Sequence, residues 1–545
     1  MKSFAGTWKL VKLALRLDRF KLPVWIVGIV GLVGASAAAL GDLYGTYEAQ
    51  LQYVSTAATS TVARAFGGIV NGVSLGSVAM VEIFAFTAVM MAFMSTLLVV
   101  RHTRKPEETG AAELIGSGRV GRYAGLTAAI IVAIAANVTV GLFMFLILSN
   151  VDGLSATGAL GFSAALACIG IAFAGVAGIA AQLSETGRGA NSIAGGVIGG
   201  AFVLRAIGDG FATVSADGLR ATPAWPTWLS PFGWGFQIHP FAQQNWWLFI
   251  LLIGFMLTTV IGSFLILRHR DVGLGIIPTR AGRARAKPSL LSTFGLTWRL
   301  QRGVLIGWSI GMLVFGLVIG GMAHEFADII KASPETAEIL AEIGGSDGTI
   351  TDTFFGAMFG FAAIIASGYI IQSLLKVRSE EASGHLEALL STKLSRGKWL
   401  ASHALVTLIG QAWMLLITGV MSGVIFVSVS GAEWTEVWRL TVGIFNYLPA
   451  LLAFSGGVIF LLGVLPRLAT GVSWAAFIGS FLILQLAALL SLPDWVLNIS
   501  PFTHIPSVPA QSIGLATFLL LCLVAAGLSM AGFLRFWRRD LTNTT

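Results

Sequence analysis

The sequence of 545 residues has little charge and almost no cysteine. Only 11% of the residues are Asp, Glu, Lys or Arg, against about 25% in an ordinary soluble domain. The two cysteines, Cys168 and Cys522, both fall inside apolar stretches, where a small hydrophobic role is expected. The sequence therefore argues against a soluble globular domain and predicts neither a disulfide framework nor a metal-ligand cluster.

What the sequence has instead is apolar residues in long runs. Hydrophobic residues make up 56% of the chain, and about 20 consecutive apolar residues suffice to cross a bilayer as a helix. We predict an all-α integral membrane protein with about 12 transmembrane helices. The expected spans are 23–40, 77–100, 123–149, 157–183, 192–208, 246–267, 304–323, 353–375, 399–429, 440–465, 472–492 and 511–534.

The basic residues predict which side of the membrane each loop faces. The net charge of +8 could indicate nucleic-acid binding, but most Lys and Arg residues lie in alternate connecting segments, as in cytoplasmic loops of membrane proteins. The segment 324–352, on the opposite side, is acidic. We expect a multi-pass protein of the bacterial plasma membrane with both termini in the cytoplasm and no nucleic-acid partner.

An internal repeat divides the chain into two halves. Thr7-Trp8-Lys9-Leu10 recurs as Thr297-Trp298-Arg299-Leu300, and the Ser-Pro-Phe at 230–232 recurs at 500–502. Six spans per half give both halves the same orientation, as in parallel repeats. We predict a pseudo-dimer with a first half at 1–267, a cytoplasmic linker at 268–288 and a second half at 289–545.

The repeat is most detailed after the second span of each half, where Gly, Glu, Ser and two basic residues keep the same spacing. Paired glutamates stand just upstream of each copy. The first copy comprises Glu107, Glu108, Gly110, Glu113, Ser117, Arg119 and Arg122, and the second comprises Glu380, Glu381, Gly384, Glu387, Ser391, Lys393 and Arg396.

Each copy has acidic residues at its start and basic residues at its end, which suits a helix dipole. Leu114 and Ile115 in one copy, and Leu386 and Leu389 in the other, add apolar side chains between the charged flanks. This pattern favours a short amphipathic helix that docks in the groove of a partner, with a plain solvated loop as the alternative.

The segment before the first span carries a stripe of basic residues spaced three and four apart, at Lys9, Lys12, Arg16 and Arg19. A helix with this stripe and apolar residues on its other faces lies in the membrane interface. It either anchors the chain to anionic lipid or acts as a hinge for the first span.

The repeated motif resembles the coupling helix of type-2 ABC exporter permeases. The twelve-span duplicated form, with its Ser-Pro-Phe-Gly-Trp at 230–234 and Arg-Asp-Val-Gly at 270–273, is most similar to actinobacterial permeases described as polyketide-antibiotic or multidrug exporters. One departure is that family members commonly have Pro before the terminal basic residue, where this chain has Val120 and Leu394.

The resemblance implies an ATP-driven exporter permease that moves hydrophobic or amphipathic molecules and works with two copies of a separate ATPase. No phosphate-binding loop of the Gly-x-x-x-x-Gly-Lys-Ser/Thr type occurs in the chain. We therefore expect no catalytic or cofactor-binding residue in this chain, with ATP and Mg²⁺ bound by the partner. The alternatives are a proton-coupled secondary transporter and, less favoured, a membrane enzyme or scaffold.

Glu82 is the most prominent ionisable residue within a span, and such residues are costly unless functional. One hypothesis is an outer-leaflet cavity for cargo, formed by Glu82, Phe86, Met90, Phe355 and Phe359, with Phe355 standing in the second half where Glu82 stands in the first. The alternative is that Glu82 pairs with Arg205. Arg205 could also pair with Asp209, four residues on, which would leave Glu82 available.

The segments 221–244 and 492–511 precede the last span of each half and contain four prolines each, so neither can be a regular helix. They are either re-entrant segments, as the resemblance implies, or ordinary external loops.

Overall fold

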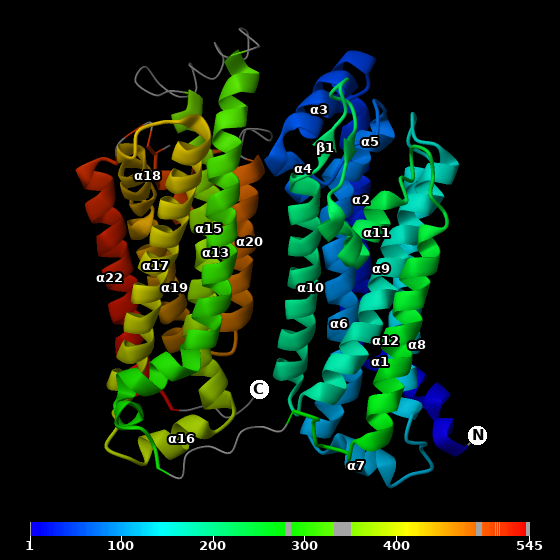
Figure 1. Cartoon of the computed structure of the whole chain (residues 1–545). Coiled ribbons are helices and arrows are strands. Elements are labelled where there is room, and N and C mark those ends of the chain that lie inside the picture. The colour runs from blue at the N-terminus through cyan, green and yellow to red at the C-terminus, as the bar shows by residue number, and fades with distance from the viewer. Residues whose placement is uncertain are drawn as a thin grey trace. The chain divides into compact units, whose positions relative to one another are not determined.

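The computed structural model describes residues 2–277, 285–331, 350–486 and 493–540, except 507, 510 and 512. The chain divides into two compact units, Met1–Gly282 and Arg283–Thr545 (Figure 1). Most of the described chain is helical, and its strands are the two-residue pair β1 (Thr213–Val214) and β2 (Ala221–Thr222) in unit 1. The all-α fold expected from the sequence is confirmed.

Unit 1 consists of six long apolar segments with short helices at both ends. The long segments are α2 (Lys21–Leu43), α5–η2–α6 (Leu75–Ala79, Met80–Phe84, Ala85–Glu108), α8 (Ala124–Leu148), α9 (Ala156–Leu183), α10 (Gly187–Gly210) and α12 (Leu248–His269). The short helices are η1 (Lys2–Phe4), α1 (Thr7–Leu17), α3 (Tyr47–Thr59), α4 (Thr61–Gly67), α7 (Ala111–Gly116), η3 (Trp225–Leu229) and α11 (Pro231–Gln237).

Unit 2 repeats much of this plan. Its long helices are α13 (Thr293–Lys331), α15 (Ile350–Ala382), α17 (Arg396–Ser430), α18 and α19 (Thr435–Phe445, Leu448–Val464), α20 (Ala469–Leu486) and α22 (Leu515–Arg538). Its short helices are η4 (Pro288–Leu291), α16 (His385–Leu390), α21 (Asp494–Leu497) and η5 (Pro501–His504).

Eleven helical segments of the described chain are long and apolar enough to cross a membrane, and α18 and α19 together form one of them. The remaining predicted span, 472–492, lies in α20 as far as Leu486, and its residues 487–492 lie outside the described residues. The acidic residues Glu335, Glu338, Glu342 and Asp347 and the linker residues 278–284 also lie outside them.

The core of unit 1 forms around α9, because its small residues allow neighbouring helices to approach closely. A β-carbon added at Gly170 would lie 1.8 Å from the Asn137 side chain of α8, and one at Gly175 would lie 2.1 Å from Thr259 of α12. Both positions therefore require glycine.

The proline-rich segment of unit 1 is not an exposed loop. Phe232 and Phe236 of α11 are fully buried, and their rings pack against Phe173 of α9 and Phe84 of the second span. Ser230 caps the start of α11, and its hydroxyl accepts a hydrogen bond from the Phe232 amide. The segment therefore enters the helix bundle, in agreement with the re-entrant alternative.

Candidate functional site

The repeated motif forms two short helices, α7 in unit 1 and α16 in unit 2. Each begins directly after a glycine with positive φ, 73° at Gly110 and 75° at Gly384. This left-handed conformation strongly favours glycine, so it explains why both copies have glycine at this point. In unit 1, α7 lies at the opposite end from α3 (Figure 1).

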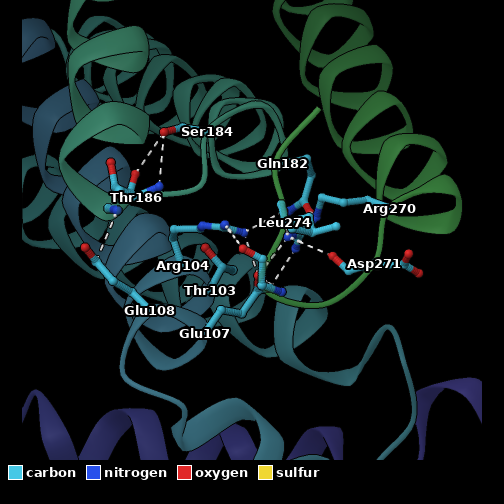
Figure 2. Close-up of polar contacts among 12 residues, drawn as sticks. Thr103, Arg104, Glu107, Glu108, Gln182, Ser184, Thr186, Arg270, Asp271 and Leu274 are labelled. Carbon is cyan, nitrogen blue, oxygen red and sulfur yellow. Dashed lines mark hydrogen bonds and ion pairs between the residues drawn. The ribbon is translucent and has the colours of Figure 1, made fainter. Parts of the chain in front are cut away.

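Glu107, at the end of α6, is the centre of a cluster of charges in unit 1 in which Arg104 and Arg270 are buried (Figure 2). Its carboxylate makes two bonds to the Arg270 guanidinium just after α12, at 2.6 and 2.7 Å. It also accepts a 2.6 Å bond from Arg104, and Arg104 in turn donates to the Gly273 carbonyl at 2.7 Å. We call Arg104, Glu107 and Arg270, together with Arg122, which bonds to the Arg270 carbonyl, the unit 1 ion-pair cluster.

The cluster joins three spans to the segment that follows α7. Arg270 donates at 2.9 Å to the Gln182 side chain at the end of α9, while Arg122 donates at 2.6 Å to the Arg270 carbonyl. The Arg270 side chain is 3% exposed, so water screens these charges weakly. The ends of α6, α9 and α12 are thereby held together next to α7.

Unit 2 contains the same cluster, formed by Arg378, Glu381, Arg396 and Arg539. Glu381 binds the Arg539 guanidinium through both oxygens, at 2.6 and 2.7 Å. Arg378 lies 3.5 Å from Glu381, and Arg396 donates at 2.6 Å to the Arg539 carbonyl. Every charge in the unit 1 cluster therefore has a counterpart that makes the corresponding contact.

The repeated spacing predicts that Glu107, Glu381, Arg122 and Arg396 couple to the partner ATPase, but the structure uses them for internal contacts. Arg104 and Arg378 lie outside the predicted motif. A signal for both was present, because an Arg stands three residues before the glutamate in each copy, and an Arg-Asp pair follows the last span of each half.

Other members of the motif are exposed at the tips. They are Glu113, Ser117 and Arg119 beside α7, and Glu387, Ser391 and Lys393 beside α16. The Ser117 and Ser391 hydroxyls each donate to a carbonyl three residues back, at 2.8 Å. Glu108 accepts a bond from the Gly187 amide at the start of α10, and Glu380 pairs with Lys376 at 2.8 Å.

Glu82 does not pair with Arg205. Arg205 and Asp209 are both fully buried and pair at 3.2 Å, and Asp209 also accepts a 2.7 Å bond from Thr227. Glu82 accepts a 2.6 Å hydrogen bond from the Tyr53 hydroxyl of α3. Burial and the Glu82 carboxylate raise the pKa of Tyr53, so the phenol remains a donor at neutral pH.

Glu82 and Phe86 line a cavity of about 470 Å³ at the α3 end of unit 1. Its other walls come from α4, α6 and α10 and are mostly apolar, including Phe66, Val89 and Phe202. Met90 is half-buried and packs against the core of unit 1 instead. The cavity combines one carboxylate with aromatic rings.

Phe355 and Phe359 occupy a different environment. Both rings are fully buried in unit 2, where Phe355 packs against Phe359 and Phe426. Counted back from Gly110 and Gly384 along uninterrupted helix, Phe359 corresponds to Ala85. Glu82 itself lies in the π-helical turn η2, where the helical register shifts. Phe355 is therefore not the counterpart of Glu82, which corrects the predicted pairing.

Two charge clusters of the same composition, each beside a short exposed helix at the end of a membrane-spanning unit, define a duplicated membrane protein. The multidrug efflux system permease protein Rv1217c of Mycobacterium tuberculosis is 34% identical over 540 residues, which cover 99% of this chain and 96% of that protein. Residues 290–537 match the family described as "Multidrug efflux system permease Rv1217c, C-terminal domain". The chain belongs to this family of multi-pass membrane permeases, and the actinobacterial resemblance is confirmed.

Proposed function

We propose that the chain is the membrane-spanning permease subunit of an ATP-driven exporter in the bacterial plasma membrane, with both termini in the cytoplasm. The observation that carries the proposal is the duplication of an exposed short helix beside a buried ion-pair cluster. A solvated loop needs no ion-pair cluster beside it, whereas a helix that receives force from a partner must be joined firmly to the spans that it moves.

Energy would come from two copies of a separate ATPase that binds ATP and Mg²⁺, one docking on α7 and one on α16. Glu113 and Glu387, each at the third position of its helix, are exposed. The ion-paired glutamates Glu107 and Glu381 would connect each docked helix to the last span of its half.

The cargo would be hydrophobic or amphipathic molecules moved outward. The permease from M. tuberculosis is named for multidrug efflux, and the Glu82 cavity suits molecules that combine an apolar body with a cationic group. Aromatic walls and a single carboxylate attract such cations without binding one structure alone.

Transport into inverted membrane vesicles that contain the chain and its native ATPase tests the proposal. We expect uptake of a fluorescent cationic drug to require ATP and to persist when an ionophore collapses the proton gradient. The Glu113→Ala/Glu387→Ala double variant should lose most of this uptake while inserting normally.

Glu48→Ala/Asp152→Ala is the matched control, because it also removes two exposed carboxylates but from the opposite end of unit 1. Its uptake should equal that of the parent chain. Uptake driven by a proton gradient without ATP would instead establish the secondary transporter, and full uptake by the Glu113→Ala/Glu387→Ala variant would refute docking at these helices.

A further inference from the structure

A cavity of about 740 Å³ lies beside the unit 1 ion-pair cluster. It is bounded by α1, α7, the start of α8 and the ends of α6 and α12, and its volume is within the range of small-molecule sites. Much of the lining is aliphatic and comes from elements distant in sequence. Leu10, Leu13, Leu17, Ile115, Leu126 and Leu267 supply it.

Two cationic side chains in the lining lack a carboxylate partner among the described residues, Lys105 at the end of α6 and Arg122 before α8. Arg122 bonds only to the Leu267 and Arg270 carbonyls, which leaves its charge uncompensated. The other arginines of the lining have carboxylate partners, because Arg270 pairs with Glu107 and Arg101 pairs with the buried Asp18.

Asp271 is the remaining acidic residue of the lining, and it is exposed. Figure 2 shows its carboxylate directed away from Glu107 and Arg270. The cavity thus combines an apolar wall with a small surplus of positive charge. A ligand that matches both features is an anionic amphiphile.

The position of α1 indicates where this ligand comes from. Trp8 is 64% exposed and Leu15 43%, while the neighbouring Lys9, Lys12 and Arg16 are exposed as well. A helix with exposed apolar and basic residues of this kind lies in the headgroup region of a membrane leaflet. The cavity that α1 lines is therefore open to lipids of that leaflet.

We propose that this cavity is a binding site for one anionic phospholipid, with its phosphate at Lys105 and Arg122 and an acyl chain along the leucines of α1 and α12. The site involves neither cargo nor ATP, so it goes beyond the proposed function. The bound lipid would connect α1 to the segment around α7.

Three variants separate this site from general attraction to the membrane. Lys105→Gln removes a headgroup contact. Gly125→Leu fills the cavity, since Gly125 lines it and an added β-carbon meets no atom within 4 Å, and Leu also favours helix over Gly. Lys12→Gln is the matched control, because it removes one exposed charge from α1 outside the cavity.

Native mass spectrometry of the full-length chain in detergent, titrated with phosphatidylglycerol or phosphatidylcholine, is the experiment. We expect one tightly held phosphatidylglycerol and no equivalent phosphatidylcholine. Lys105→Gln should weaken this binding about fivefold, Gly125→Leu should abolish it and Lys12→Gln should leave it unchanged.

Equal retention of both lipids, or equal binding by all three variants, would overturn the proposal in favour of non-specific surrounding lipid. Displacement of phosphatidylglycerol by millimolar inorganic phosphate would also overturn it, because the site would then recognise a free anion. None of these outcomes depends on an ATPase, so they leave the exporter proposal to its own test.

Discussion

The two units begin with nearly the same tetrapeptide, yet they use it differently. In unit 1, α1 ends at Leu17 and α2 begins at Lys21, whereas in unit 2 the helix α13 runs without a break from Thr293. Asp18 follows α1, is fully buried and binds Arg101 at 3.0 Å and His102. Counting from the tetrapeptides, its counterpart is Trp308, inside α13. A buried acidic residue with partners on α6 therefore marks the turn that unit 2 lacks.

The contacts that hold the first helix of each unit, α1 and α13, also differ. Val11 and Ala14 hold α1 against Ala128 and Val132 of α8 through apolar contacts. The counterpart of Val11 is Gln301, whose amide donates to His403 at 2.7 Å and whose carbonyl accepts from Ser373.

Both ion-pair clusters, in contrast, are alike in every charged residue. We infer that the contacts around the short helices α7 and α16 tolerate less change than the contacts of α1 and α13 do. The first of the three experiments below tests this view directly.

The largest effect is expected from breaking the clusters. Glu107→Gln leaves the buried Arg270 without its carboxylate, and Glu381→Gln does the same to Arg539. Each should lower the free energy of local opening by roughly 3 kcal/mol, since an unpaired buried charge is left behind. Hydrogen exchange at residues 104–123 and 378–397 measures this.

The Glu107→Arg/Arg270→Glu exchange should recover part of the loss in unit 1. If only one of the two glutamine variants increased hydrogen exchange, the two clusters would not be equivalent.

A smaller effect is expected from His239, which follows α11 and has positive φ. Burial lowers the pKa of His239 to about 4, below the unfolded value near 6.5. Between these pH values the unfolded chain binds a proton that the folded chain does not, so the unfolding free energy falls as the pH drops from about 6.5 to about 4.

His239→Asn should remove roughly 2 kcal/mol of this acid-dependent loss, and Asn tolerates the left-handed backbone. The measurement is thermal unfolding in detergent at pH 7.5 and 4.5, with the parent chain compared at each pH. An identical pH response of parent and variant would show that burial in the proline-rich segment 221–244 does not hold His239 neutral.

The smallest effect concerns the docking surfaces. Leu114 of α7 is 80% exposed, and its counterpart in α16 is Ala388. Under the proposed function, Leu114→Ala should weaken ATPase binding by about 1 kcal/mol, or roughly fivefold, and Ala388→Leu should strengthen it similarly. Titration with the purified ATPase measures both, and no change in either variant would exclude contact at this position.

Much of the fold could be predicted from the sequence because its signals are local. A run of apolar residues identifies a span whatever its neighbours are, and a repeated spacing identifies two related halves. The glycines before α7 and α16 were visible for the same reason, since a left-handed residue is encoded at one position.

The partner of each charged residue, in contrast, could not be predicted from the sequence around it. Glu107 and Arg270 are 163 residues apart, and nothing in the pattern around either one shows that α6 and α12 end side by side. Likewise, Glu82 has Tyr53 as its partner because α3 packs near the start of the second span. Only the tertiary structure could distinguish this contact from the pairing with Arg205.

The sequence by itself therefore determined that the chain spans a membrane repeatedly, is duplicated and carries two copies of a short motif. The tertiary structure decided which charges of that motif are buried, which are exposed and where the halves diverge. The physical reason is that hydrophobicity and repeat spacing act along the chain, whereas an ion pair requires its two groups to approach within about 4 Å, a distance set by helix packing.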